Sequence, residues 1–393
     1  MLRWVILLAL TSGGCSWILP LNDRSEDGGS AVEARAGQEG GVTPDLTPTT
    51  DDATGDALSG EATVGPGDAT PDAPVDCLEA LGCTSGWCKL PTATTAALHD
   101  LWGSGVNDLW AVGEVGTVLR FVRDKCKWSP DTTVPTTETL LAVAGDGTTV
   151  FVGGNGGTLL EWTKAGGWVQ ANIDNTVPTT TDPVQALAVA DVGSTKVAFA
   201  AGGSELDPTG GFIWKRTSGV WTGLSSSTAR IYALSAGAGA VYAGGVGSLQ
   251  VLDLSNEING FQVVSPCGAG AQQQINGIWS TGVMTSATTH ALVAVGFDHQ
   301  ISGRFMMYQA FGSSCVSLPE SGTGAWNDVA GLSLSDYWLV GAQAAVKQKA
   351  GSALSAHTLP STVDFHAVWV NPTATPKLVV VAGDNGEVWA RTY

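Results

Sequence analysis

The sequence predicts an all-β protein: a seven-bladed β-propeller that is closed by an N-terminal strand and preceded by a disordered tether. Three observations lead to this prediction. Short apolar segments recur between Gly-rich turns, charged residues make up only 14% of the 393 residues, and Gly (52) and Trp (15) are abundant. Few long amphipathic helices can be written with so few charges, whereas many short strands joined by Gly turns can.

The first ten residues have the features of a secretory signal peptide. Arg3 precedes the apolar run Trp4–Leu10, which is shorter than the roughly 20 residues of a membrane span but suits a signal-peptide core. Small residues and then Cys15 follow, in LALTSGGCS. This segment resembles a bacterial lipobox, in which the Cys is acylated and becomes the mature N-terminus.

The lipobox resemblance implies that residues 1–14 are removed as a signal peptide and that Cys15 carries the lipid. Ser16, rather than Asp, follows the Cys. By the same resemblance this residue favours the outer over the inner membrane in a Gram-negative cell. The alternative is an ordinary secretory peptide cleaved near Gly14, in which Cys15 has no special role.

Residues 15–82 are predicted to form a disordered acidic tether. The segment Leu21–Ala80 contains 14 acidic and 2 basic residues, a net charge of −12, and consists mainly of Asp, Thr, Pro, Gly, Ala and Ser. Such a segment cannot bury enough apolar surface to offset the entropy cost of ordering it. We expect a solvated spacer, about 40 Å long on average, that holds a folded domain, residues 83–393, away from a membrane.

Seven degenerate copies of one pattern fill the predicted domain. Each of the first six copies contains four short strands and the seventh contains three, and one apolar marker residue in the first strand recurs at intervals of 39 to 51 residues. Periods of this order are typical of propellers and solenoids. Four antiparallel strands per copy indicate a propeller, in which each blade covers the apolar face of its neighbour. The markers are Leu101, Val143, Leu187, Leu234, Ile278, Val329 and Val368.

The two ends of this region are predicted to share one blade. The seventh copy reaches Tyr393 directly after its third strand, and Gly86–Pro91 (GWCKLP), upstream of the first copy, is similar to the fourth strands of the other copies. We therefore expect the N-terminal strand to complete the last blade, because an incomplete ring would present an unpaired strand edge.

Two phrases, LHDLWGSGVNDLWAVGEVGTVL and AVWVNPTATPKLVVVAGDNGEVW, resemble known propeller repeats. They are similar to those of photosystem II assembly-factor-like proteins and of myxobacterial exported lipoproteins. The resemblance covers most of residues 84–393 and implies the fold and a role in binding or assembly rather than catalysis.

Ala382–Trp389 (AGDNGEVW) also resembles a sialidase-type Asp-box, but Ala382 stands where Ser or Thr is expected. We interpret this segment as a stabilising turn.

Six cysteines remain when Cys15 is set aside, and an even number in an exported chain indicates three disulfides. We expect Cys267 to pair with Cys315, because they lie at the fourth strands of adjacent copies. The other four lie near the closing strand and blade one, where two bridges would lock the closure, with their pairing left open. Zinc is the alternative, but no His accompanies these cysteines. The disulfide candidates are Cys77, Cys83, Cys88, Cys126, Cys267 and Cys315.

The candidate binding site is the mouth of the central channel, which the innermost strands line. The residue two positions before each marker is polar in six of the seven copies, Leu141 being the exception, and the sevenfold recurrence places these residues on one ring. Blades one and seven are neighbours, so His99 and His366 should lie side by side with Asp100 near them. The predicted ligand-binding residues are His99, Asp100, Gln185, Tyr232, Asn276, Asn327, Asp328 and His366.

These residues also fit a structural role, in which polar side chains of the inner strands hydrogen-bond one another and channel water. Two His and one Asp could ligate a metal, but we predict no metal and no cofactor. GxSxG, HExxH and P-loop motifs are absent from the sequence, so we predict no enzyme activity. Lys and Arg are not clustered on any segment, which argues against nucleic acid.

The sequence therefore predicts a non-catalytic, membrane-anchored exported lipoprotein of the cell envelope. We expect a monomer attached to the membrane through its lipid alone, whose propeller is a protein-binding or assembly scaffold. The first alternative is a carbohydrate-binding or glycosidase-like propeller that uses the channel mouth. The second is a structural component of the envelope.

Overall fold

The computed structural model describes residues 77–83, 86–174, 181–204, 210–224, 230–237, 239–257, 260–264, 273–281, 290–298, 304–312, 314–317, 324–371 and 376–393. All of them belong to one compact unit, Ala69–Tyr393. The predicted signal peptide, Cys15 and most of the predicted tether lie outside the described residues. Within the described part of the chain, no helix has the length and apolar character needed to cross a membrane.

The described strands form seven four-stranded antiparallel sheets. The first strands are β2 (Leu98–Gly105), β6 (Leu140–Gly145), β10 (Val184–Val192), β14 (Ile231–Ala236), β18 (Gln273–Ser280), β22 (Trp326–Ser333) and β26 (Phe365–Val370). The second strands are β3 (Asp108–Gly113), β7 (Thr149–Gly154), β11 (Thr195–Gly203), β15 (Ala240–Gly245), β19 (His290–Asp298), β23 (Asp336–Gly341) and β27 (Leu378–Gly383).

The two outer strands of each sheet follow in the same order. The third strands are β4 (Val118–Val122), β8 (Leu159–Thr163), β12 (Gly211–Thr217), β16 (Ser248–Asp253), β20 (Arg304–Gly312), β24 (Val346–Ala350) and β28 (Val388–Thr392). The fourth strands are β5 (Lys127–Pro130), β9 (Gly167–Gln170), β13 (Val220–Gly223), β17 (Gln262–Val263), β21 (Ser314–Ser317), β25 (Ala353–His357) and β1 (Cys88–Leu90).

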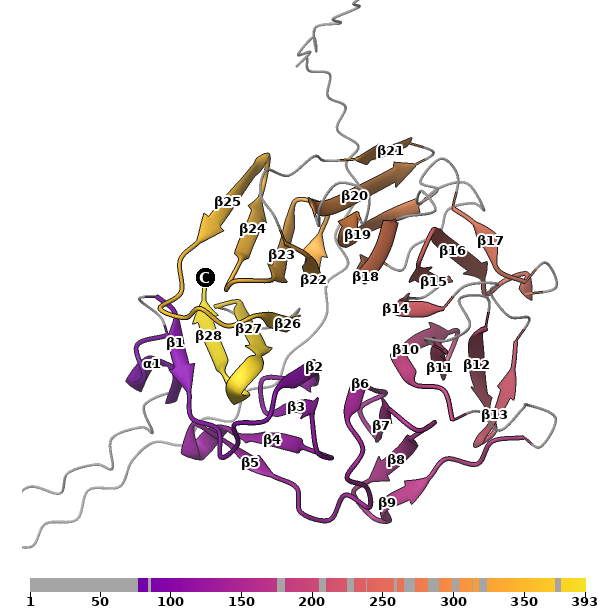
Figure 1. Ribbon diagram of the computed structural model, residues 1–393, viewed down its shortest axis with the longest axis horizontal. Helices are drawn as coiled ribbons and strands as arrows, with labels where there is room; N and C mark the ends of the chain where they lie inside the picture. Colours follow the sequence, from indigo (N-terminus) through magenta and orange to yellow (C-terminus); the bar gives the residue numbers. More distant parts are fainter. Residues whose placement is uncertain are drawn as a thin grey trace, which may run out of the picture. The chain divides into compact units, whose positions relative to one another are not determined.

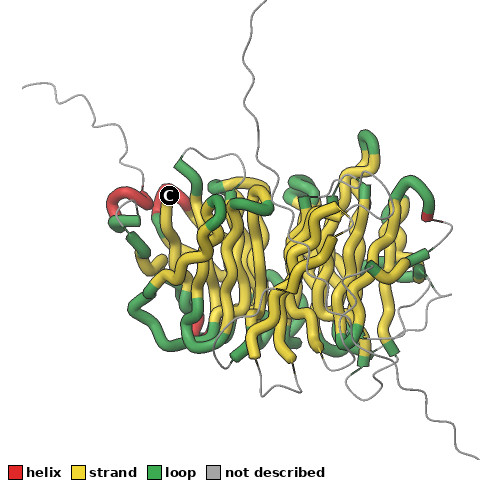
Figure 2. Tube along the Cα trace, turned by 90° about the horizontal axis from the view of Figure 1, so that it is seen from above, coloured by secondary structure: helices red, strands yellow, loops and turns green. Residues whose placement is uncertain are grey.

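The sheets of this unit are arranged around a central channel. Each first strand contacts the first strand of the next sheet, and β26 contacts β2, so the contacts continue around the whole circle. Figure 1 shows these first strands on the inner side, and the side view in Figure 2 shows strands running between the two faces of the ring. The predicted all-β propeller architecture is confirmed.

The apolar residues of the second strands explain why the sheets pack face to face. Every residue of β27 is buried, as expected for a strand covered on both faces. Trp110 and Val112 of β3 pack against Val143 and Val152 of the next sheet. Burying each such side chain contributes about 1.5–3 kcal/mol, so the interfaces between sheets hold the ring together.

The N-terminal strand closes the ring. β1 pairs antiparallel with β28, with Cys88 opposite Ala390 and Leu90 opposite Val388. Between them, the Lys89 Nζ donates a hydrogen bond to Glu387 Oε1 at 2.6 Å. The prediction that this strand completes the last sheet is confirmed, and Figure 1 shows β1 beside β28.

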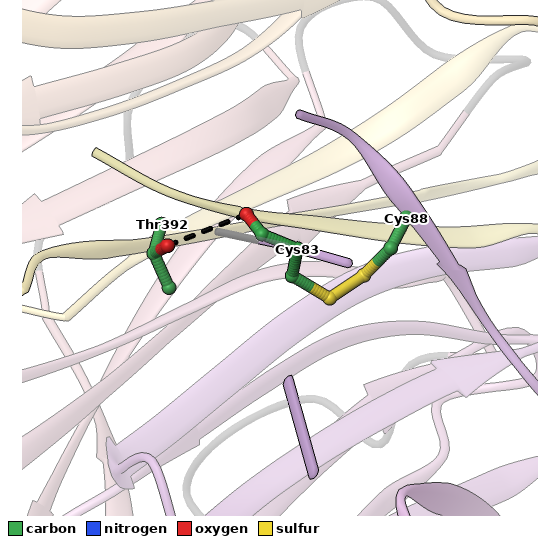
Figure 3. The surroundings of a disulfide bond; sticks show 3 residues. All are labelled: Cys83, Cys88 and Thr392. Carbon is green, nitrogen blue, oxygen red and sulfur yellow. Dashed lines mark hydrogen bonds between the residues drawn. A yellow bond between two sulfur atoms is a disulfide. The ribbon is translucent and has the colours of Figure 1, made fainter. Parts of the chain in front are cut away.

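A disulfide joins Cys83 to Cys88 at the start of the closing strand. The carbonyl oxygen of Cys83 accepts hydrogen bonds from the backbone N–H of Thr392 at 3.0 Å and from its Oγ1 at 3.3 Å, as Figure 3 shows for the hydroxyl. Both cysteines are therefore held against β28, Cys83 through these bonds and Cys88 through strand pairing.

The other predicted disulfides are resolved only in part. Cys126 is disulfide-bonded, in agreement with a second bridge near the closure. Cys267 lies outside the described residues, so its pairing with Cys315 of β21 stays a prediction.

The predicted tether extends too far toward the domain. Residues 77–80 form a short helix, α1 (Cys77–Ala80), that lies against the 3-10 turn η1 (Arg123–Lys125). Leu78 is buried in the same apolar cluster as Leu90. The prediction of disorder is wrong for residues 77–82, because one buried Leu and the adjacent disulfide order the segment.

Candidate functional site: the central channel

Every first strand carries a β-bulge at the same position. The register between first and second strand shifts by one residue in all seven sheets, for example between Leu98 and Asp100. A bulge leaves its extra residue unpaired and re-aims its side chain. The extra residues are His99, Leu141, Gln185, Tyr232, Asn276, Asn327 and His366.

A glycine near the end of each second strand makes the bulge possible. A Cβ on Gly113 would collide with the carbonyl oxygen of Ala97, the residue that leads into β2, and a Cβ on Gly383 would collide with that of Asp364. The same close approach recurs in the other sheets at Gly154, Gly202, Gly245, Gly296 and Gly341. The Gly at this position of each second strand therefore permits the close backbone approach that accompanies the bulge.

All seven bulge residues line one cavity of about 680 Å³ in the centre of the ring. The structure thus brings together every residue predicted for the channel mouth, including Asp100 and Asp328. Sequence reasoning missed other lining residues. Trp102 and Trp279, which directly follow the markers Leu101 and Ile278, and Gln274 also line the cavity.

Two aspartates of the cavity wall join neighbouring sheets. Asp100 accepts the backbone N–H of Leu101 at Oδ1 (2.8 Å) and that of Val143, in the next sheet, at Oδ2 (2.7 Å).

Asp328 repeats this arrangement between β22 and β26. It accepts the backbone N–H of Val329 at Oδ1 (2.7 Å) and that of Val368 at Oδ2 (2.9 Å). In both cases the Asp directly precedes the marker residue of its own sheet and accepts a hydrogen bond from the marker residue of the next sheet. The repeat therefore places the carboxylate where two first strands meet.

The protein surroundings disfavour the charged form of both carboxyl groups. Burial and, to a smaller extent, the charge of Asp328 together raise the pKa of Asp100 to about 8, against the lowering effect of the two backbone hydrogen bonds. Burial raises the pKa of Asp328 to about 7. The channel therefore holds two carboxyl groups that change protonation near neutral pH.

The predicted pair of histidines is also present. The rings of His99 and His366 lie 5.4 Å apart, centroid to centroid, at an angle of 49°. Burial lowers the pKa of His99, and His366 lowers it further, while Glu114 and Asp384 act in the opposite direction.

The histidine pair also has an acidic neighbour that sequence reasoning missed. His366 Nε2 lies 2.8 Å from Asp384 Oδ1, in the turn between β27 and β28. The segment AGDNGEVW, which we interpret as a turn, was the feature of the sequence that could have pointed to Asp384. Across the described residues, no group of three or more His, Cys, Asp or Glu side chains is arranged to hold a metal ion.

Some predicted site residues serve the ring itself. Asn276 donates from Nδ2 to the Trp326 carbonyl at 3.0 Å, and Asn327 donates to the Phe365 carbonyl at 2.8 Å. Each amide reaches the residue just before the bulge of the next sheet. Asn276 and Asn327 therefore have the structural role that the sequence allows as the alternative to ligand binding.

Tyr232 has a cationic neighbour that sequence reasoning missed. The guanidinium of Arg230, a buried residue, lies 4.7 Å from the centre of the Tyr232 ring. This cation–π contact covers one side of the ring. Arg230 is not among the residues that line the cavity.

Solved structures with the same fold share little sequence with this chain. A structure titled "YCF48 bound to D1 peptide" has 15% identity and a TM-score of 0.57, covering 78% of this chain and 97% of its own. YCF48 from Cyanidioschyzon merolae has 15% identity and a TM-score of 0.56, covering 78% and 98%.

A structure of the RRP9 WD40 repeats is similar to the same extent, with 12% identity, a TM-score of 0.57, and coverage of 79% of this chain and 98% of its own. No family model matches the sequence, and comparison with curated proteins finds no match. The chain is therefore similar in fold to YCF48 and WD40 propellers, and this similarity shows the propeller architecture.

Proposed function

We propose that this protein is a non-catalytic scaffold that binds a protein partner through its central channel. One observation carries the proposal: seven bulges, one in each sheet, direct their extra residues to a single cavity of about 680 Å³. This volume lies within the range of about 300–1,000 Å³ typical of ligand sites. In this proposal each sheet is one blade of a seven-bladed ring.

The similar structures support a protein ligand. The YCF48 structure of the comparison was solved with a D1 peptide. The cavity of this chain can hold a loop or peptide, because its wall combines an aromatic ring, that of Tyr232, with the amide of Gln185 and the two histidines. Tyr is also among the residues that contribute most at protein interfaces.

We propose that the propeller works outside the cytoplasm, on a lipid anchor. The lipobox-like segment before Cys15 and the acidic segment that follows it support this location. Labelling cells with radioactive palmitate should mark the protein, and Cys15→Ser should abolish the label. A labelled Cys15→Ser variant would contradict the anchor and leave the channel proposal intact.

Site-specific photo-crosslinking tests the binding proposal. A photoreactive residue at Gln185, in the cavity, should cross-link one identified partner in the native cell. The same residue at Asp191, an exposed position at the other end of β10, is the matched control and should not. With the purified partner, Tyr232→Ala should weaken binding about thirtyfold, the effect of an interface hot spot. Equal labelling at both positions, or unchanged affinity of the variant, would reject the channel as the binding site.

A carbohydrate is the second candidate ligand. Trp102 and Trp279 line the cavity together with Gln185 and Gln274, and aromatic faces beside amide groups suit a sugar. A glycan array separates the two candidates, because a sugar ligand should bind the wild type and should lose affinity in Trp279→Ala.

A further inference from the structure

We propose that the channel accepts a basic side chain, Lys or Arg, from the bound partner, with Asp100 and Asp328 as its counter-ions. This inference rests on the proposed function and specifies the chemistry of the partner. It depends on the charges of the cavity wall, the hydrogen bonds of the two carboxylates and the aromatic residues that line the same cavity.

The cavity wall carries two acidic side chains, Asp100 and Asp328, and, among the described residues that line it, no Lys or Arg. The two are close enough for the charge of one to raise the pKa of the other. Two like charges in a partly desolvated site repel each other, and a cation between them would remove this repulsion.

The hydrogen bonds of the two carboxylates leave acceptor capacity. Each oxygen of Asp100 and of Asp328 accepts one backbone N–H. An ionised carboxylate offers about four lone-pair sites, so each group has capacity for a further donor. The backbone bonds also fix both side chains in place, which reduces the entropy lost when a ligand binds.

Aromatic residues provide the rest of a site for a long basic side chain. Trp102 and Trp279 line the same cavity. Indole faces attract guanidinium and ammonium groups, and they cover the apolar stems of Arg and Lys. The volume of about 680 Å³ exceeds one side chain and leaves room for the loop that carries it.

The titratable groups at the mouth also favour a cation. His99 and His366 line the cavity next to Asp100, and the pKa of His99 is lowered, so its neutral form predominates at neutral pH. Glu114 and Asp384 lie close enough to His99 to act on its pKa. With His99 neutral, that ring does not repel an entering Lys or Arg, and the ionised fraction of Asp100 and Asp328 in the wall attracts it.

Calorimetry on the full chain tests this inference with a defined probe, acetyl-Gly-Arg-Gly-amide. Its neutral counterpart carries citrulline, which has nearly the shape of Arg without the charge. We expect the Arg peptide to bind at least about tenfold more tightly than the citrulline peptide, because only the charged guanidinium can donate charge-assisted hydrogen bonds to Asp100 and Asp328.

Binding should also release protons. At about pH 7.5 the two carboxyl groups together hold about one proton, given pKa values of about 8 and about 7, and a bound cation would displace it. Titrations in two buffers of different ionisation enthalpy measure this release on the wild type, so the result does not depend on the folding of a variant.

Variants assign the effect to residues. Asp100→Asn and Asp328→Asn should each weaken the Arg peptide about tenfold, whereas Asp191→Asn, which removes one exposed carboxylate at the far end of β10, should not. Equal affinity for the Arg and citrulline peptides, binding without proton release, or unchanged affinity in both folded variants would overturn the inference.

The two proposals fail in different ways. If the Gln185 cross-link identifies a partner and the Arg peptide does not bind, the basic side chain is wrong and the protein-binding channel stands. If Gln185 gives no cross-link and the Arg peptide does not bind, both the protein-binding channel and the basic side chain are wrong.

Discussion

Asp100 accepts a hydrogen bond from the backbone N–H of Val143, a residue 43 positions later in the chain and one sheet farther around the ring. The carboxylate thereby joins β2 to β6 at the wall of the channel. Asp328 makes the equivalent bond to Val368 between β22 and β26. The groups that we propose to bind a ligand are thus also part of the ring, and this double role leads to the first prediction.

Stability should fall as pH rises from about 4 to about 8 because of Asp100 and Asp328. Their folded-state pKa values, about 8 and about 7, exceed the ordinary value of 3.8, so folding takes up protons in this window. The contribution of these two groups to the free energy of unfolding is fully present below their unfolded-state pKa, and it is lost as the pH rises through their folded-state pKa values. We expect the melting temperature to fall by about 5 °C between about pH 5.5 and about pH 8.5.

The double variant Asp100→Asn/Asp328→Asn provides the check on this pH dependence. It should show a flatter curve of melting temperature against pH, while Asp191→Asn, an exposed position, should keep the wild-type slope. Identical slopes in all three proteins would show that these carboxyl groups do not carry the pH dependence.

His99 should titrate below its ordinary pKa of 6.5 in an NMR experiment that follows the imidazole protons. Burial is the main cause, and the neighbouring His366 adds to it. His366→Gln should therefore raise the midpoint of His99, while Asp384→Asn, which removes a nearby negative charge, should lower it further. Shifts of the same sign in both variants would contradict this electrostatic account.

Reduction of the Cys83–Cys88 disulfide should loosen the closure. The loop is short, so the chain-entropy effect is about 2 kcal/mol. Cys83→Ser/Cys88→Ser should lower the free energy of unfolding by this amount and speed hydrogen exchange at Ala390 and Thr392, which pair with the closing segment. Exchange in β7, on another sheet, is the internal control. A uniform change across all sheets would mean that the closure is not a separate unit.

Gly383→Ala should destabilise the protein by about 2–3 kcal/mol, because its Cβ would strike the Asp364 carbonyl at the bulge. Gly105→Ala is the matched control. A Cβ at that position meets nothing within 4 Å, so the change should stay within about 0.5 kcal/mol. Urea denaturation measures both, and equal effects would disprove the steric role of the recurring glycine.

Most of the architecture could be predicted from repetition. The second strands β3 and β27 lie inside the two phrases that resemble propeller repeats, at DLWAVG and LVVVAG. Repetition also located the ring residues, because sevenfold spacing places equivalent positions at equal depth. The closing strand was predictable from the similarity of GWCKLP to the other fourth strands.

Contacts between distant residues could not be predicted in the same way. The partner of His366 is Asp384, which lies 18 positions away and enters the site from a turn. The order of residues 77–82 depends on the burial of Leu78 against residues far along the chain, which no local pattern reveals.

The sequence by itself determined the repeat, the closing strand and the identity of the ring residues, because spacing and apolar pattern are properties of the chain. Only the tertiary structure decided the protonation of Asp100 and Asp328, since their pKa values depend on burial, and that of Asp100 depends also on the charge of Asp328. It also decided that Asn276 and Asn327 serve the ring, because their hydrogen-bond partners lie on neighbouring sheets.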